Sequence, residues 1–307
     1  MEHFLNDPMA LSVPDLTEAV EFFTRRLGFR LEMIMPADAP RLALLAGQGV
    51  VVRLEAAASP SQDATGAWRT GRAGMQYRDL IPGRLGGAFI ASHIRIPEGG
   101  EAPDYVHYHK VRFQMIYCKA GWVRVVYEDQ GPPFVLEAGD CVLQPPEIRH
   151  RVLESSPGLE VIEIGAPATH ETWADHELSL PTAQAHPKRL FGRQRFARHR
   201  ASEAQWAPWR LDGFEARDTG IAAATDGLAG ACVVRAPRNL VATLPAHTGE
   251  FLFFFVLQGE LRLDARRLNA DDCCVIPAGA ATELRASDGL EFLEVSLPAR
   301  RRENGRD

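Results

Sequence analysis

The chain has 307 residues, of which 46% are hydrophobic and 24% are charged, and its formal net charge is −6. This apolar fraction is ordinary for a folded protein and excludes intrinsic disorder for the bulk of the chain. The excess of acidic over basic residues argues against nucleic acid as a partner. No apolar run approaches the ~18 residues of a membrane-spanning helix, and we recognise no secretory signal. We therefore expect a cytoplasmic protein that binds neither membranes nor nucleic acid.

Residues 1–57 are predicted to form a small module with the element order β-α-β-β-β. Asp15 followed three residues later by Glu18 is typical of a helix start, and Gly28 is typical of a helix end. Apolar residues recur at helical spacing between these points. Strand-like runs flank the helix at residues 9–13, 29–35, 41–46 and 50–55.

The same segment resembles one half of the vicinal-oxygen-chelate family, which includes glyoxalases and bleomycin-resistance proteins. The resemblance rests on the string VPDLTEAVEFFTRRLGFRLE, which starts at Val13. That family joins two such halves into one cleft and usually has a metal-binding histidine on the first strand, where this chain has Pro8. The resemblance therefore implies a module for packing or for pairing with a second chain, and we expect a homodimer.

Two similar halves follow a linker of small and polar residues at 58–67. Two sequence pairs of the first half recur in the second: Trp68-Arg69 as Trp209-Arg210, and Arg78-Asp79 as Arg217-Asp218. Each copy continues into runs of alternating apolar residues, which are typical of strands. The repeat predicts two homologous β-rich domains at residues 68–167 and 206–300, joined by a connector at 168–205.

The first half carries two motifs, HYHKVRFQMIYCKAG and GDCVLQPPEIRH. His107 and His109 are two residues apart, a spacing that puts both imidazoles on one face of a strand. The second motif ends at His150. Together the motifs resemble those of the cupin superfamily, whose members fold as small antiparallel barrels with the two motifs on facing strands. The resemblance implies that His107, His109 and His150 bind one divalent metal ion inside the barrel.

Gln114 stands where cupins usually have a glutamate. An amide coordinates a metal only through its neutral carbonyl oxygen, so Gln114 is either a weak ligand or a group that hydrogen-bonds near the metal. The resulting three-histidine set resembles that of ferrous cupin dioxygenases, which cleave hydroxylated aromatic acids or β-dicarbonyl compounds. This resemblance implies Fe(II) as the favoured cofactor, with zinc, nickel and manganese as alternatives.

Four further residues near the motifs are candidates for contact with a small-molecule substrate. A guanidinium group pairs well with a carboxylate, so Arg112, Arg124 or Arg149 is expected to anchor a substrate acid. Tyr105 precedes the first histidine by two residues and can act as an acid or a base. With Gln114, these residues make up the predicted catalytic set.

The second half lacks the histidine motif. Alignment of the two copies puts His247 at the position of His109. Other residue types take the remaining three ligand positions: Pro245, Leu252 and Thr282. One histidine cannot hold a catalytic metal, so we expect a structural copy. Four aromatic residues are expected to fill its interior and interfaces: Phe251, Phe253, Phe254 and Phe255.

These patterns predict a mainly β bicupin, with two antiparallel double-stranded β-helix (jelly-roll) barrels preceded by the βαβββ module. The favoured function is that of a metal-dependent dioxygenase for a small aromatic or dicarbonyl acid. Two alternatives stay open. One is a non-oxidative metal enzyme, such as an isomerase, lyase or cyclase, and the other is a non-catalytic cupin that binds a small molecule.

Overall fold

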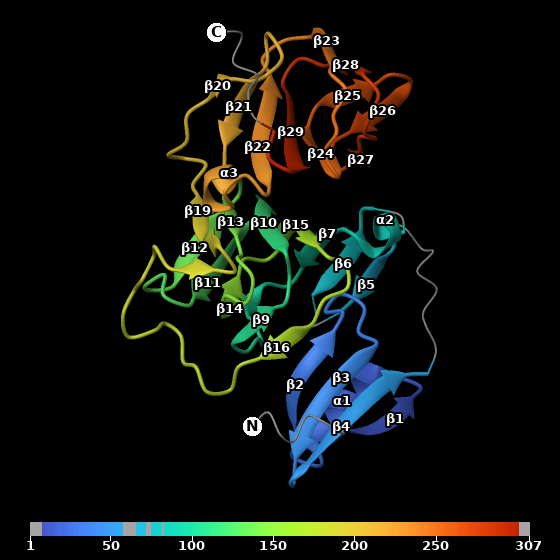
Figure 1. Cartoon of the computed structure of the whole chain (residues 1–307), viewed down its shortest axis with the longest axis vertical. Coiled ribbons are helices and arrows are strands. Elements are labelled where there is room, and N and C mark those ends of the chain that lie inside the picture. The colour runs from blue at the N-terminus through green and yellow to red at the C-terminus, as the bar shows by residue number, and fades with distance from the viewer. Residues whose placement is uncertain (1–7, 58–65, 72–74, 82, 301–307) are drawn as a thin grey trace. The chain divides into compact units, whose positions relative to one another are not determined.

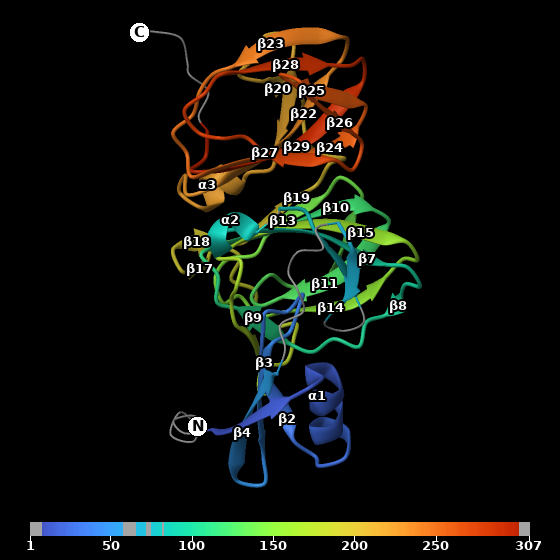
Figure 2. The ribbon, with the colours of Figure 1, turned by 90° about the vertical axis from the view of Figure 1, so that its right-hand side faces the viewer.

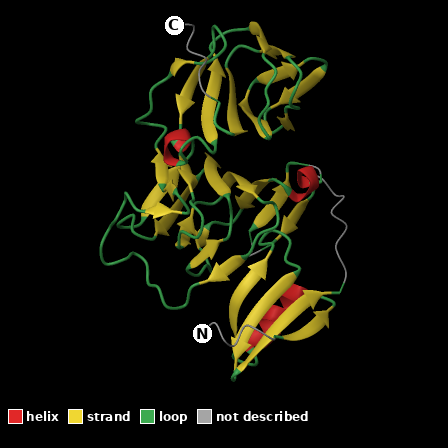
Figure 3. Ribbon diagram, viewed as in Figure 1, coloured by secondary structure: helices red, strands yellow, loops and turns green. Residues whose placement is uncertain are grey.

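The computed structural model describes residues 8–57, 66–71, 75–81 and 83–300. Its regular structure is mostly β-strand, which confirms the prediction of a mainly β protein (Figure 3). Among the described helices, only α1 (Leu16–Arg25) is longer than four residues, and none could span a membrane. The chain divides into two compact units, Met1–Gly139 with Gln144–Gly192 and Asp140–Leu143 with Arg193–Asp307.

The N-terminal segment of the first unit has the expected element order β-α-β-β-β (Figure 1). Strand β1 runs parallel to β4, whereas β4, β3 and β2 pair in antiparallel fashion. Helix α1 contacts β2, β3 and β4, and its Leu16 is buried with Leu45 and Leu54. The strands are β1 Met9–Val13, β2 Arg30–Met35, β3 Leu42–Gly47 and β4 Val50–Ala56.

Helix α1 begins at the residues that the sequence indicated. The side chain of Asp15 accepts a hydrogen bond from the backbone N–H of Glu18 at 2.9 Å. This bond satisfies one of the donors that the first turn of a helix leaves unpaired. Three residues after the helix ends, Gly28 has a φ of +71°, a left-handed conformation that glycine adopts without a steric penalty.

The rest of the first unit is a barrel of two antiparallel sheets that lie one above the other in Figure 2. One sheet has the order β2-β16-β9-β14-β11-β12, so the N-terminal sheet continues into the barrel through β16. The other contains β10, β15, β7, β6 and β5. The elements are β5 Trp68–Thr70, β6 Gln76–Asp79, α2 Arg84–Gly87, β7 Ile90–Ile96, β8 Gly100–Glu101, β9 His107–His109, β10 Phe113–Ala120, β11 Trp122–Tyr127, β12 Phe134–Glu137, β14 His150–Ser155, β15 Leu159–Ala166, β16 Thr172–Ala174 and β17 Leu190–Phe191.

The second unit also contains two antiparallel sheets, with the orders β20-β21-β22-β29-β24-β27 and β23-β28-β25-β26. Strand β24 is buried on both faces, and its Phe254 packs on Phe292 at 4.7 Å between ring centres. The elements are β13 Cys141–Leu143, β18 Gln194–Arg195, β19 Ala197–His199, β20 Ala207–Pro208, β21 Glu215–Asp218, α3 Ile221–Ala224, β22 Gly230–Ala236, β23 Leu240–Leu244, β24 Phe251–Gln258, β25 Glu260–Leu263, β26 Arg266–Asn269, β27 Cys273–Val275, β28 Thr282–Ala286 and β29 Leu290–Leu297. Its interior is filled by side chains that include Phe254, and the other three phenylalanines named above are buried on the opposite face of β24.

The strand order of the second barrel repeats that of the first, since β21-β22-β29-β24 corresponds to β6-β7-β15-β10. A cation–π contact recurs with it. The guanidinium of Arg95 lies 3.9 Å from the ring centre of Trp68, and that of Arg235 lies 4.1 Å from the ring centre of Trp206. Trp206 is therefore the counterpart of Trp68. Sequence spacing instead matched Trp68 with Trp209, which is buried in the core of the second barrel.

The contact at the start of α1 can be tested by local hydrogen exchange. Asp15→Ala removes the cap and should weaken the helix by about 1 kcal/mol, which corresponds to roughly fivefold faster exchange of the α1 amides. Asp15→Asn keeps an acceptor in place and should exchange at nearly the wild-type rate. Mass-spectrometric exchange on a peptide covering α1 measures both variants. Equal exchange in Asp15→Ala and the wild type would contradict the assignment.

Candidate metal centre

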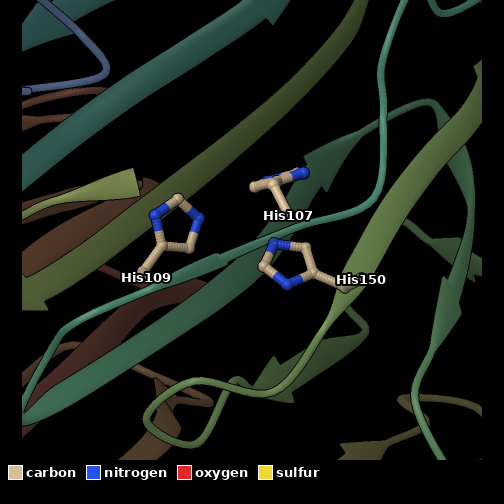
Figure 4. A group of neighbouring side chains, drawn as sticks. All are labelled: His107, His109 and His150. Atoms are coloured by element: carbon tan, nitrogen blue, oxygen red, sulfur yellow. The ribbon is translucent and has the colours of Figure 1, made fainter. Parts of the chain in front are cut away.

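Three imidazoles converge inside the first barrel (Figure 4). His107 and His109 come from β9, and His150 is the first residue of β14. The two strands are antiparallel neighbours in which His107 lies directly opposite His150. One nitrogen from each ring lies within 4.8 Å of the other two, and all three residues are buried. The alternation of a β-strand thus places His107 and His109 on one face, as their spacing predicted.

Hydrogen bonds at Nδ1 orient each ring. His107 donates its Nδ1–H to the carbonyl oxygen of Tyr105 at 2.8 Å, and His150 donates to that of Ile148 at 3.0 Å. A carbonyl oxygen only accepts, so both rings carry a proton on Nδ1, and in the neutral ring Nε2 is then unprotonated. His109 Nδ1 lies 2.9 Å from the hydroxyl of Thr172, which can accept in the same way. Three neutral imidazole nitrogens are the donors that a divalent transition metal prefers.

Buried neighbouring side chains contact the rings of His107 and His150. An Asp104 oxygen lies 3.6 Å from His107 Nδ1, and that carboxylate also accepts a hydrogen bond from the backbone N–H of Val152. The ring of Tyr127 stacks on that of His150 with 5.4 Å between centres. A carboxylate behind a ligating histidine increases the basicity of the ring, and packing limits its rotation.

The orientation of the Gln114 amide is set by a carboxylate. Its Nε2 donates a hydrogen bond to Glu163 on the adjacent strand β15. A carboxylate only accepts, so the amide nitrogen faces Glu163 and the carbonyl oxygen faces away from it. Gln114 is 1% exposed, and its Oε1 has no hydrogen-bond partner among the residues that the structure describes.

The donor set fits a metal ion. Gln114 lines the same cavity as the three histidines, so its buried, unpartnered carbonyl oxygen is a candidate fourth donor. All four donors are uncharged, and a metal held by them would keep its full positive charge. In the described part of the chain, no other group of histidine, cysteine and carboxylate side chains could hold a metal.

A cavity of about 110 Å³ adjoins the imidazoles between the two sheets of the barrel. Its polar lining residues are the three histidines with His170, Gln114, Gln144, Glu163 and Asp38. The remaining walls are aliphatic or aromatic: Ala37, Met75, Tyr77, Ile90, Ile94, Ile96, Ile116, Val123, Val125, Tyr127, Leu136, Val152, Leu159 and Val161. The cavity therefore offers a mainly apolar surface with a few polar groups, among them the three imidazoles.

The three arginines predicted to anchor a substrate do not line this cavity. Arg124 is exposed and pairs with Glu154 on the outside of the sheet. Arg149 lies over the ring of Tyr108, which points to the face opposite the histidines. Arg112 is exposed. On β11, Val123 and Val125 point into the cavity, so the strand alternation turns the residue between them outward.

Tyr105 does not line the cavity either. Its ring packs edge-on against His107 with 5.8 Å between centres, and its carbonyl oxygen orients that histidine. The structure thus gives Tyr105 a positioning contact through its backbone, and the acid or base role of its hydroxyl stays a prediction.

One histidine and two acidic residues of the cavity were not found from the sequence. His170 lies in the loop before β16 and packs against His109, with 5.4 Å between ring centres. Glu163 and Asp38 reach the cavity from β15 and from the loop between β2 and β3. None of them belongs to a spaced motif. For Glu163 the sequence offered one indication. Glu163 lies two residues after Val161 on β15, so both side chains point to the same face of the strand.

The second barrel places His247 in a different contact. Its Nε2 donates a hydrogen bond to the carbonyl oxygen of Ile276 at 3.0 Å. At the other aligned positions, Leu252 and Thr282 are buried. This imidazole therefore connects the loop between β23 and β24 to the backbone just after β27.

Comparison with known proteins agrees with this geometry. Residues 92–164 match the cupin domain family. A point mutant of oxalate decarboxylase from Bacillus subtilis is similar in fold, with a TM-score of 0.55 and 12% identity over 79% of this chain and 80% of that one. The formate complex of Lactobacillus farciminis oxalate decarboxylase also has a TM-score of 0.55, with 13% identity over 77% of this chain and 85% of that one. No curated protein is similar enough in sequence to count as a match. At these identities the likeness concerns the fold, which is cupin-like and similar to that of a bicupin.

Metal binding can be tested one ligand at a time. His107→Ala, His109→Ala and His150→Ala should each abolish stoichiometric binding of Co(II) or Zn(II), because two imidazoles and a neutral amide hold a metal weakly. His186→Ala, at an exposed position, is the matched control and should bind one ion per chain. Elemental analysis and titration calorimetry measure the outcome. Full binding by any of the three variants would remove that residue from the centre.

The hydrogen bond between Gln114 and Glu163 can be tested in metal-free protein. Gln114→Glu alone sets two carboxylates against each other and should lower the free energy of unfolding by about 1–3 kcal/mol. Adding Glu163→Gln restores one donor and one acceptor, with their positions exchanged, and should recover most of that loss. Chemical denaturation measures both. If the double variant is no more stable than the single one, the orientation assigned to the amide is wrong.

Proposed function

We propose that this protein is a metal-dependent cupin enzyme, a dioxygenase that acts on a small aromatic or dicarbonyl compound. The observation that supports the proposal is the uncharged donor set of three imidazoles and one carbonyl oxygen beside a mainly apolar cavity. When bound there, Fe(II) would supply the redox chemistry and the site at which substrate and dioxygen meet. The resemblance to three-histidine cupin dioxygenases favours iron over zinc, nickel or manganese.

The chain's own residues position and shield the reacting groups. His107, His109 and His150 would hold the metal through Nε2, with Asp104, Thr172 and the two backbone carbonyls fixing their rings. Gln114 would lie beside the metal without neutralising it. The aliphatic walls would limit the contact of bound groups with water, which protects reactive species from side reactions and strengthens electrostatic interactions.

We also propose that residues 9–56 are a vicinal-oxygen-chelate-like half-module with a structural task. Its strand β2 pairs with β16, where Thr172 lies opposite Ile34. Thr172 also lies opposite His109 and is hydrogen-bonded to it. The module therefore supports the strand that orients one metal ligand.

A non-oxidative function is the second candidate, because two groups that can exchange protons line the cavity. His170 donates its Nδ1–H to the carbonyl oxygen of Pro167 at 3.0 Å, which leaves Nε2 as an acceptor, and Glu163 offers a carboxylate. A zinc-loaded isomerase or lyase would use such groups around a Lewis acid. Turnover by zinc-loaded protein without dioxygen would favour this candidate.

Oxygen consumption tests the dioxygenase proposal. Protein loaded with Fe(II) should consume dioxygen with at least one of catechol, gentisate and 2,4-pentanedione, at a rate at least ~100-fold above that of His109→Ala. His186→Ala should retain the wild-type rate. An oxygen electrode measures uptake, and mass spectrometry identifies incorporated oxygen. Absence of uptake with all three compounds would overturn the proposal.

A further inference from the structure

The second barrel contains a pocket of its own, at one end of its interior. The volume of this pocket is about 290 Å³, and every described residue that lines it belongs to the second unit. The neighbouring strands β22 and β29 contribute Cys232, Glu294 and Ser296. These residues have the same parity along their strands as Val234 and Phe292 of the core, so they point to the inside of the barrel.

The pocket corresponds in position to part of the cavity in the first barrel. Ile116 lies opposite Glu163 in the first barrel, and Phe254 lies opposite Glu294 in the second. The alignment of the two copies also matches Ile116 with Phe254, so Glu294 is the counterpart of Glu163. Both barrels therefore place a carboxylate at this position, whereas the three-histidine cluster belongs to the first barrel.

Small side chains leave the space of the pocket open. Gly230 lies opposite Ser296, at the position that Ile90 takes in the first barrel. Most of the remaining wall is formed by a proline and by alanines: Ala207, Pro208, Ala216, Ala222, Ala231 and Ala299. This wall is apolar, and it contacts a bound molecule through methyl groups and backbone.

A buried ion pair forms the polar part of the pocket. Arg210 donates hydrogen bonds to both carboxylate oxygens of Glu294, one of them at 2.6 Å from Nη1. The two side chains are 12% and 5% exposed, and the guanidinium lies 4.0 Å from the ring centre of Trp209. Burial of two charges costs free energy, and well-packed apolar residues of similar volume often give equal stability. The stability of the barrel therefore does not account for an ion pair at this position.

The ion pair keeps donors and an acceptor that the described residues do not use. Arg210 donates two of its five N–H groups to them, both to Glu294, and its buried Nε–H has no partner among them. Cys232 lies 3.9 Å from a Glu294 oxygen, and burial with this carboxylate raises the pKa of its thiol, which therefore stays a weak donor. A carboxylate accepts about four hydrogen bonds, so Glu294 can accept one more.

The charges of the described lining residues cancel. Arg210 and Arg300 are the cations, and Asp218 and Glu294 are the anions. A ligand carboxylate would compete with Glu294 for Arg210, and a ligand ammonium group would compete with Arg210 for Glu294. Either exchange leaves a buried charge without its partner. A hydroxyl group both donates and accepts, so it can bond to the ion pair without breaking it.

We propose that the second barrel binds a small uncharged molecule with several hydroxyl groups, such as a polyol or a monosaccharide. Neighbouring hydroxyls would accept from Arg210 and donate to Glu294, and the C–H groups between them would contact the alanine wall. The proposal does not depend on the metal centre, which belongs to the other barrel. It gives the second barrel a binding role in addition to its structural one.

Binding of uncharged and charged relatives tests the class of ligand. The uncharged probes are xylitol, D-glucose and myo-inositol, and the charged relatives of glucose are D-glucuronate and D-glucosamine. Titration calorimetry on the full chain should give at least one uncharged probe a Kd of about 1 mM or lower. Both charged sugars should bind at least tenfold more weakly than that probe. Absence of binding by all three uncharged probes, or tighter binding of a charged sugar, would overturn the proposal.

A pair of substitutions on α3 tests the location of the site. Ala222→Leu narrows the pocket and should weaken binding of the uncharged probe at least tenfold. Ala223→Leu is the matched control, because Ala223 is exposed, lies next in the same helix and does not line the pocket. Ligand-detected NMR measures the Kd of both variants. Wild-type affinity in Ala222→Leu, or an equal loss in Ala223→Leu, would place the binding elsewhere and contradict the proposal.

A charge substitution tests the task of the ion pair. Glu294→Gln leaves Arg210 without its anion, so binding of the uncharged probe should weaken at least threefold and binding of D-glucuronate should tighten at least tenfold. Glu291→Gln on the same strand is the control, because Glu291 does not line the pocket. Circular dichroism checks the fold of both variants. An equal fall in both affinities would contradict recognition by the ion pair, and if Glu294→Gln does not fold, the two α3 variants decide the outcome.

Discussion

The candidate metal centre depends on hydrogen bonds at the far side of each imidazole. A histidine ring has two nitrogens, and only an unprotonated one binds a metal. Carbonyl oxygens fix the proton on Nδ1 of His107 and His150, and Thr172 meets the same atom of His109. Because these groups belong to the barrel's own strands and turns, folding of the barrel fixes the orientation of all three rings.

The carboxylate next to this centre belongs to the strand beside the one on which cupins usually carry it. Cupins usually have a glutamate at the position of Gln114, whereas here the carboxylate belongs to Glu163 on β15 and accepts from the Gln114 amide. A metal would therefore be held by neutral donors with an anion in the adjoining wall.

The second barrel keeps the strand order of the first barrel but not its three-histidine cluster. Strand order and the Arg–Trp contact are kept, since Arg235 on Trp206 repeats Arg95 on Trp68. The interior is filled by aromatic side chains such as Phe254, and its one aligned histidine bonds to the backbone. The repeat could be recognised in the sequence, but which tryptophan corresponds to Trp68 could not. Trp206 and Trp209 lie three residues apart, and only their packing in the structure distinguishes them.

Short-range periodicity in the sequence by itself determined the βαβββ order and the mainly β fold. The convergence of His150 with His107 and His109 was implied by the resemblance to the cupin motifs. The period of two along a strand puts His107 and His109 on one face, and the same rule turns Arg124 outward between Val123 and Val125. Only the tertiary structure decided the rest of the cavity, where Asp38, Glu163 and His170 meet from distant loops and strands. Their proximity arises from sheet pairing, which brings together residues with no fixed separation along the chain and so leaves no spacing in the sequence to read.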